Sequence, residues 1–147
     1  ELLNKEVEAA NIGLIKTLYS DYNTAFIKND FPRIASHFEA PVNFASDGII
    51  AEKEKDVVER YEVMKATIQE GYAYSITGDV AIKRQSENSY LLCADFTRIN
   101  KQKEVLFEGR AEYQWINVPD KGWKMNYLKG IDRGSNPNCI LDGNKPF

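Results

Sequence analysis

The chain has 147 residues, of which 43% are hydrophobic and 12% aromatic, and this length and composition predict one domain with one core. The 19 basic and 22 acidic residues are interspersed and give a net charge of -3. Because there is no Lys/Arg-rich run, we expect no nucleic-acid partner. No apolar stretch approaches the roughly 20 residues that a membrane span requires, so we expect no membrane partner either.

The cysteines and the single histidine, His37, argue against a metal site. Cys93 lies in an apolar run and Cys139 in a polar tail, and their spacing matches no zinc motif. We therefore expect no metal and no cofactor. Two unrelated thiols are favoured over a disulfide between them, because free cysteines are commonly buried, but the disulfide stays open. The chain begins at Glu1 without a Met, which a removed leader would explain; localisation is open, with the cytoplasm favoured.

A long helical pattern runs from residue 4 to Asn29. It is either one helix or a short helix followed by a long one, with the division at Gly13. Near its end, Tyr22, Ala25 and Phe26 recur at the spacing of one helical face. This face is an aromatic stripe that needs to be covered by the rest of the chain.

A second, short helix is predicted directly after the first. Asp30 can cap it, and Pro32 suits its first turn because the missing N–H is not needed there. Its apolar side is predicted to consist of Ile34, Ala35 and Phe38.

Two short strands and a third helix follow. Ala40-Pro41 favours extended backbone, residues 42–45 alternate as a strand, and Ile49-Ile50 can pair back after the turn at residues 46–48. Residues 52–71 predict an amphipathic helix that stops at Gly71. Its apolar side carries Val57, Val58, Tyr61, Met64 and Ile68.

From Tyr72 onwards the hydrophobic period is two. Strands are predicted at residues 72–86, 89–99, 104–118 and 122–130, separated by short turns. Such turns make an antiparallel meander, and Thr77-Gly78-Asp79 is a candidate bulge that would bend it. We expect an α+β domain over residues 1–130 and an irregular tail over residues 131–147.

The order of these elements resembles the NTF2-like superfamily, which includes SnoaL-like proteins and ketosteroid isomerase. The local matches are the stretch from Tyr22 to Phe38 and Gly122-Trp123-Lys124-Met125. The resemblance implies a cone in which N-terminal helices pack on a curved antiparallel sheet. It also implies a homodimer formed through the outer sheet face, whose residues would include Leu91, Cys93, Asp95 and Thr97.

Only part of the isomerase site carries over to this sequence. Tyr22 matches the tyrosine that donates a hydrogen bond to the developing oxyanion in that family. The position of the general base falls near Ser46, with Asp47 one place away and expected to point to the other face of a strand. The position of the protonated aspartate falls at about Ala111, so the steroid isomerase chemistry is not expected.

The strand at residues 89–99 contains the most charged segment within an apolar run. Its more apolar face, with Phe96 and Arg98, is predicted to point inward, which places Arg98 near a pocket rim and Asp95 outside. An Arg above aromatic walls can hold a carboxylate. The alternative, in which Arg98 forms an ion pair with Glu112 or with another strand neighbour in the surroundings of Asp95, is at least as well supported.

These patterns favour a pocket that binds a small hydrophobic or aromatic molecule, which could be anionic. The alternative is a small lyase, isomerase or cyclase that uses Tyr22 and a rim group. Weak catalytic candidates are Tyr22, Asp47 and His37, although His37 is favoured as a capping or core-edge residue. The predicted ligand-binding residues are Tyr22, Phe26, Phe44, Tyr61, Phe96, Arg98, Tyr113, Trp115 and Tyr127.

Overall fold

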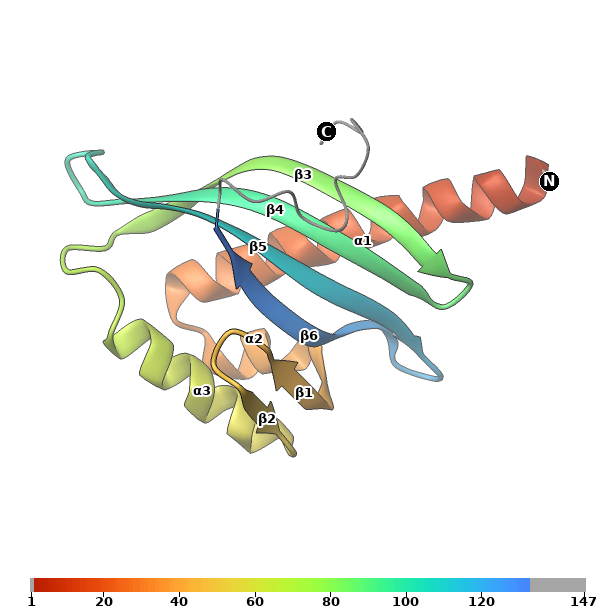
Figure 1. Cartoon of the computed structure of the whole chain (residues 1–147), viewed down its shortest axis with the longest axis horizontal. Coiled ribbons are helices and arrows are strands. Elements are labelled where there is room, and N and C mark those ends of the chain that lie inside the picture. Colours follow the sequence, from red (N-terminus) through yellow and green to blue (C-terminus); the bar gives the residue numbers. More distant parts are fainter. Residues whose placement is uncertain (1, 133–147) are drawn as a thin grey trace.

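The structure, a computed structural model, describes residues 2–132. Three helices lie on one side of a curved sheet, which confirms the predicted α+β fold (Figure 1). The helices are α1 (Leu2–Lys28), α2 (Phe31–Ser36) and α3 (Glu54–Ala66). The strands are β1 (Phe38–Phe44), β2 (Ile49–Ala51), β3 (Tyr74–Ser86), β4 (Ser89–Ile99), β5 (Val105–Val118) and β6 (Gly122–Ile131).

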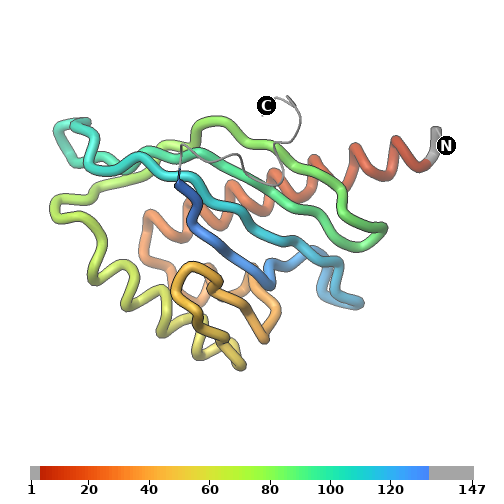
Figure 2. Tube along the Cα trace, in the orientation of Figure 1, coloured from red at the N-terminus to blue at the C-terminus, as the bar shows by residue number. Residues whose placement is uncertain are grey.

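The six strands form one sheet in the order β2-β1-β6-β5-β4-β3. Strands β3 to β6 make the predicted antiparallel meander, which the trace in Figure 2 follows hairpin by hairpin. β1 instead lies parallel to β6, with Phe44 beside Leu128, so the expectation of a wholly antiparallel sheet is wrong at this pair. No short turn joins β1 to β6, and a long crossover permits parallel pairing. The predicted bulge is present, because the register with β4 shifts between Thr77 and Val80.

The helices follow the predicted pattern with two differences, one of which is that α3 ends at Ala66, with Thr67 as its C-terminal cap, and not at Gly71. α1 is continuous through Gly13, where nothing lies within 4 Å of an added Cβ. Asn29 has a φ of 60° and ends the helical run, and the Asp30 side chain accepts a hydrogen bond from the Arg33 backbone N–H at 3.3 Å. Phe38 was expected on the second helix but begins β1, because α2 ends at Ser36.

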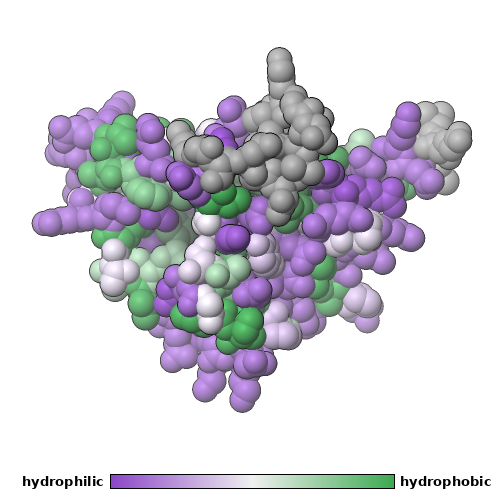
Figure 3. Space-filling view, in the orientation of Figure 1, coloured by the Kyte–Doolittle hydropathy of each residue, from purple (hydrophilic) through white to green (hydrophobic). Residues whose placement is uncertain are grey.

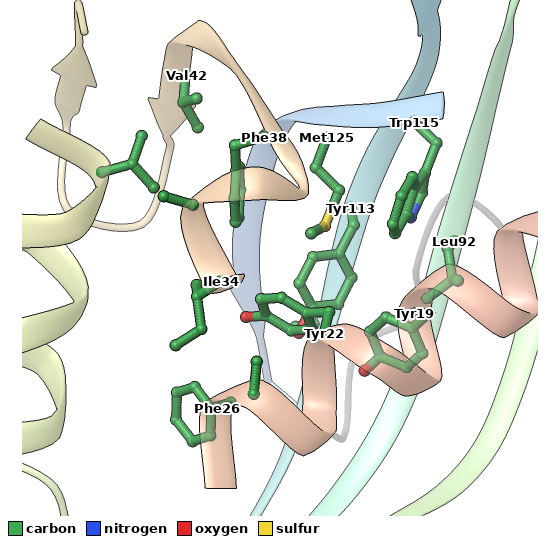
Figure 4. Close-up of a cluster of buried hydrophobic side chains, with 14 of the residues drawn as sticks. Tyr19, Tyr22, Phe26, Ile34, Phe38, Val42, Leu92, Tyr113, Trp115 and Met125 are labelled. Atoms are coloured by element: carbon green, nitrogen blue, oxygen red, sulfur yellow. The ribbon is translucent and has the colours of Figure 1, made fainter. Parts of the chain in front are cut away.

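The core lies between the helices and the concave face of the sheet. Figure 4 shows Tyr19, Tyr22 and Phe26 of α1 facing the side chains of Tyr113 and others from the sheet. Strand alternation on β4 is as predicted: Leu92 and Ala94 belong to this core, whereas Leu91 and Cys93 form a separate buried cluster. The homodimer expected through that outer face stays a prediction.

Cys93 is disulfide-bonded, so the favoured expectation of a free core thiol is wrong. Burial in an apolar run is compatible with either state, and spacing alone cannot distinguish them. Cys139, the only other cysteine of the sequence, lies outside the described residues, as does the predicted tail beyond residue 132. Within the described part, no helix is both long and apolar enough to cross a membrane. Figure 3 shows mostly hydrophilic residues on the face in view, with apolar ones in small patches.

Candidate functional site

A cavity of about 200 Å³ lies between α1 and the concave face of the sheet. Its walls come from α1, from β1 and the turn after it, from α3 and from strands β3 to β6. It is lined by Tyr19, Tyr22, Asn23, Phe26, Phe44, Ser46, Asp47, Met64, Ser75, Phe96, Arg98, Ala111, Tyr113, Leu128 and Gly130.

The cavity exists because the inward-facing side chains become smaller along two neighbouring strands. Along β5 they are, in order, Trp115, Tyr113, Ala111 and Gly109. Along β6, Met125 is followed on the same face by Leu128 and Gly130. The bulky ends of these strands are filled like any protein interior, whereas Ala111 and Gly130 leave space beneath α1.

Tyrosine side chains form part of the cavity wall. The hydroxyl groups of Tyr22 and Tyr61 lie 2.6 Å apart in a buried hydrogen bond, and the Tyr22 ring also meets the ring of Tyr113 edge-on. Burial, the largest cause, raises the pKa of all three phenols well above the ordinary value. They therefore stay protonated at neutral pH and present donors rather than bases.

Ser46 and Asp47 lie at the turn between β1 and β2, and both line the cavity. Asp47 was expected to point away, but strand alternation does not apply because the two residues are in a turn. The Asp47 carboxylate accepts a hydrogen bond from Arg60 at 2.7 Å. The Ser46 hydroxyl accepts one from the backbone N–H of Gly130 at 2.6 Å.

Arg98 lines the opposite side of the cavity. Its guanidinium stacks near the rings of Phe96, Phe107 and Phe26, at 5.1, 5.3 and 5.8 Å from the ring centroids. Its Nη1 donates to the side-chain carbonyl of Gln69 at 3.1 Å.

The alternative pairing of Arg98 with an acid of the sheet is not formed. The Glu112 carboxylate accepts from the Tyr127 hydroxyl at 2.8 Å, and Asp95 binds Arg110. Both acids lie on the outer face of the sheet, opposite to Arg98. The prediction that Arg98 faces inward and Asp95 outward is thus confirmed.

The cavity brings together six of the nine predicted ligand-binding residues: Tyr22, Phe26, Phe44, Phe96, Arg98 and Tyr113. Tyr61 lies behind Tyr22 as its hydrogen-bond partner, and Trp115 is fully buried in the packed core. The placement of Tyr127 in the cavity is wrong. The register between β5 and β6 shifts by one residue at Asn126, which turns Tyr127 to the outer face beside Gln114 and brings Leu128 inward.

His37 does not line the cavity. It is the C-terminal cap of α2, as favoured, and its Nε2 lies 2.7 Å from the Asp21 carboxylate of α1. Arg33 also binds Asp21, at 2.8 Å, and these hydrogen bonds, that from Arg33 being the larger cause, lower the pKa of Asp21. The cluster ties α1 to α2 and offers a structural role for His37.

Several lining residues were missed by sequence reasoning. Tyr19 lies one turn before Tyr22 and extends the same aromatic stripe, so helical spacing could have found it. Ser75 and Gly130 carried no such signal, because their role depends on which strands meet. Among the described residues, no group of His, Cys, Asp and Glu side chains could hold a metal ion.

Comparisons with solved structures support the fold. A domain of unknown function with a cystatin-like fold from Nostoc punctiforme has a TM-score of 0.69 at 14% identity, covering 82% of this chain and 76% of that chain. A protein assigned as a scytalone dehydratase from Novosphingobium aromaticivorans has a TM-score of 0.68 at 16% identity, covering 86% of each chain. A structure from Catenulispora acidiphila in complex with S-DNPA has a TM-score of 0.64 at 11% identity, covering 83% of this chain and 94% of that chain.

At these identities the similar structures show the fold alone. No curated protein matches the sequence. The family described as NTF2-like protein (DUF6841) matches residues 8–128, which run from the second turn of α1 into β6, the last strand. The chain therefore belongs to this family of NTF2-like proteins.

Proposed function

We propose that the protein binds a small, mainly hydrophobic ring compound in the cavity between α1 and the sheet. The observation that carries this proposal is the taper of β5 and β6, which leaves a space walled by aromatic side chains and by a few polar groups. Ligand sites in proteins have this composition, with apolar walls that bury the ligand and few polar groups that orient it.

The size of the cavity limits the ligand. A volume of about 200 Å³ is smaller than the roughly 300–1,000 Å³ of sites for drug-sized molecules. A compound of one or two rings suits this space better than a steroid. Aromatic walls favour flat rings, because offset and edge-to-face contacts add to the burial of apolar area.

A second candidate is a small lyase, isomerase or cyclase. The observation in its favour is that Tyr22, a protonated donor, and Asp47, a carboxylate, line the same cavity. One of the structurally similar proteins is assigned as a scytalone dehydratase, an enzyme of this class. Against it, the Asp47 carboxylate is bound by Arg60, and Ala111 stands where the isomerase family has its second acid. We therefore favour binding without catalysis.

Blocking the cavity tests the proposal. Native protein is titrated by calorimetry with 1-naphthamide and with 1-naphthoate, and the titrations are repeated with Ala111→Leu, whose longer side chain fills the space, and with Gln114→Leu, on the outer face of the same strand. We expect binding of at least one probe to native protein and to the Gln114 variant, and about a tenfold or larger loss in the Ala111 variant.

Two results would contradict the proposal. One is that neither probe binds the folded native protein. The other is that both variants bind a probe as native protein does, which would place the site elsewhere. Turnover of a probe, lost in Asp47→Asn, would instead support the enzyme candidate.

A further inference from the structure

We propose that the cavity selects a ring compound bearing a carboxylate, which the free edge of the Arg98 guanidinium binds through two hydrogen bonds. This inference rests on the proposed function, because the ring occupies the same cavity. It adds the chemical class of the ligand and the residue that recognises it.

The first step is the state of the guanidinium itself. Arg98 is half-buried, and its Nε is a buried donor without a hydrogen-bond partner. Its Nη1 is taken by Gln69, which leaves the edge formed by Nε and Nη2. Among the described residues, neither atom of that edge forms a hydrogen bond. A guanidinium edge of two parallel N–H groups matches the two oxygens of a carboxylate.

Second, Arg98 lacks the acidic partner that the other described arginines have. The four other arginines of the described chain each form an ion pair with an acid: Arg33 with Asp21, Arg60 with Asp47, Arg84 with Glu8 and Arg110 with Asp95. Arg98 forms no ion pair among the described residues and is neutralised only by ring faces and one amide. Burial is the main cause that lowers the pKa of Arg98, because removing the guanidinium from water disfavours its charged form. A bound anion would offset that cost of burial.

The third step is the charge of the surroundings. Lys65 of α3 and Arg98 both lie near the ring of Phe26. The Nζ of Lys65 is 4.2 Å from the ring centroid, and the guanidinium carbon of Arg98 is 5.8 Å from it. Burial, and after it the charge of Arg98, lower the pKa of Lys65 to about 8. Asp47, the one acid among the described lining residues, is already paired. The potential at Arg98 therefore favours an anion.

The fourth step is the rigidity of the site. The guanidinium lies against the neighbouring rings of Phe96 and Phe107, whose centroids are 6.0 Å apart, and the Phe96 ring lies where a Cβ added at Gly109 would stand. The ring can occupy this place only because residue 109 has no side chain. Gly109 is thus a positioning residue, because it permits the place of the Phe96 ring against which Arg98 lies.

The test compares an acid with its neutral amide of the same shape. Native protein, Arg98→Met and Arg98→Lys are titrated with 1-naphthoate and 1-naphthamide at low salt. Arg84→Met serves as a matched control, because Arg84 lies on β3 away from the cavity lining. We expect native protein and the control to prefer the acid by about tenfold or more, since a charge-assisted pair is lost with the amide.

In Arg98→Met this preference is expected to vanish while the amide binds as before, and Arg98→Lys should restore only part of it, because an ammonium lacks the fork. Added salt should weaken the binding of the acid and leave the binding of the amide unchanged. Equal binding of acid and amide by native protein, or an unchanged preference in Arg98→Met, would overturn this inference and leave the proposed function standing. Failure of both probes to bind would contradict the proposed function itself.

Discussion

The two ends of the concave face are built from the same strands, but one end is fully packed and the other contains a cavity. At one end, Trp115 and Met125 are fully buried and belong to the packed core. At the other end, Ala111 and Gly130 line a cavity whose walls also carry polar side chains. The difference shows that one sheet can provide stability at its bulky end and a binding site at its small end. Changes at the two ends should therefore affect different properties.

The largest expected effect is at the packed end. Trp115→Ala removes a fully buried ring, and we expect the free energy of unfolding to fall by about 3 kcal/mol or more. Urea unfolding followed by circular dichroism measures this. A loss below about 1 kcal/mol would show that this end is not the main source of stability.

The next effect lies where the two ends meet. Tyr22→Phe leaves the buried Tyr61 hydroxyl without its partner, which should cost about 2 kcal/mol of unfolding free energy. The double variant with Tyr61→Phe should lose less than the sum of the single changes. Tyr74→Phe is a control, because the Tyr74 hydroxyl forms no hydrogen bond within the part of the chain that the structure describes. Additive losses would mean that the hydrogen bond does not couple these residues.

A substitution at the cavity end should change ligand binding more than it changes stability. Ala111→Leu fills space with apolar atoms and is expected to change the free energy of unfolding by less than about 1 kcal/mol, in either direction. The same variant is expected to lose ligand binding. A destabilisation as large as that of Trp115→Ala would mean that the small end is as tightly packed as the bulky one.

The smallest effect is the pH dependence contributed by Lys65. Its pKa is about 8 in the folded protein and near 10.5 in the unfolded chain, so between these values the unfolded state binds more protons and stability rises with pH. The ammonium is only half-buried, and we therefore expect native protein to gain about 1 kcal/mol or less relative to Lys65→Met between pH 7 and pH 9.5.

Lys55→Met, an exposed change on the same helix, should show no such gain. Urea unfolding at the two pH values measures the difference. A stability difference between native protein and Lys65→Met that falls as pH rises would contradict the assignment.

The elements of the fold could be predicted because their signals are local. The aromatic stripe of α1 and the turns of the meander follow from spacing and turn residues alone, and so does the inward direction of Arg98. What could not be predicted depends on distant partners. The parallel pairing of β1 with β6, the bulge that turns Tyr127 outward and the disulfide at Cys93 leave no periodic trace.

The cavity itself is of this second kind. Ala111 and Gly130 are ordinary strand residues in the sequence, and only the pairing of β5 with β6 places them on neighbouring positions. Six of nine predicted ligand-binding residues nevertheless line it, because aromatic residues on known faces converge wherever the helix covers the sheet.

The most direct test of the central claim is a crystal structure of the native protein grown with 1-naphthoate. The account predicts the ring between α1 and the small residues Ala111 and Gly130, with both carboxylate oxygens on the Nε and Nη2 edge of Arg98. A cavity filled by the protein's own side chains, or a probe bound outside it with Arg98 still held only by Gln69, would contradict the account.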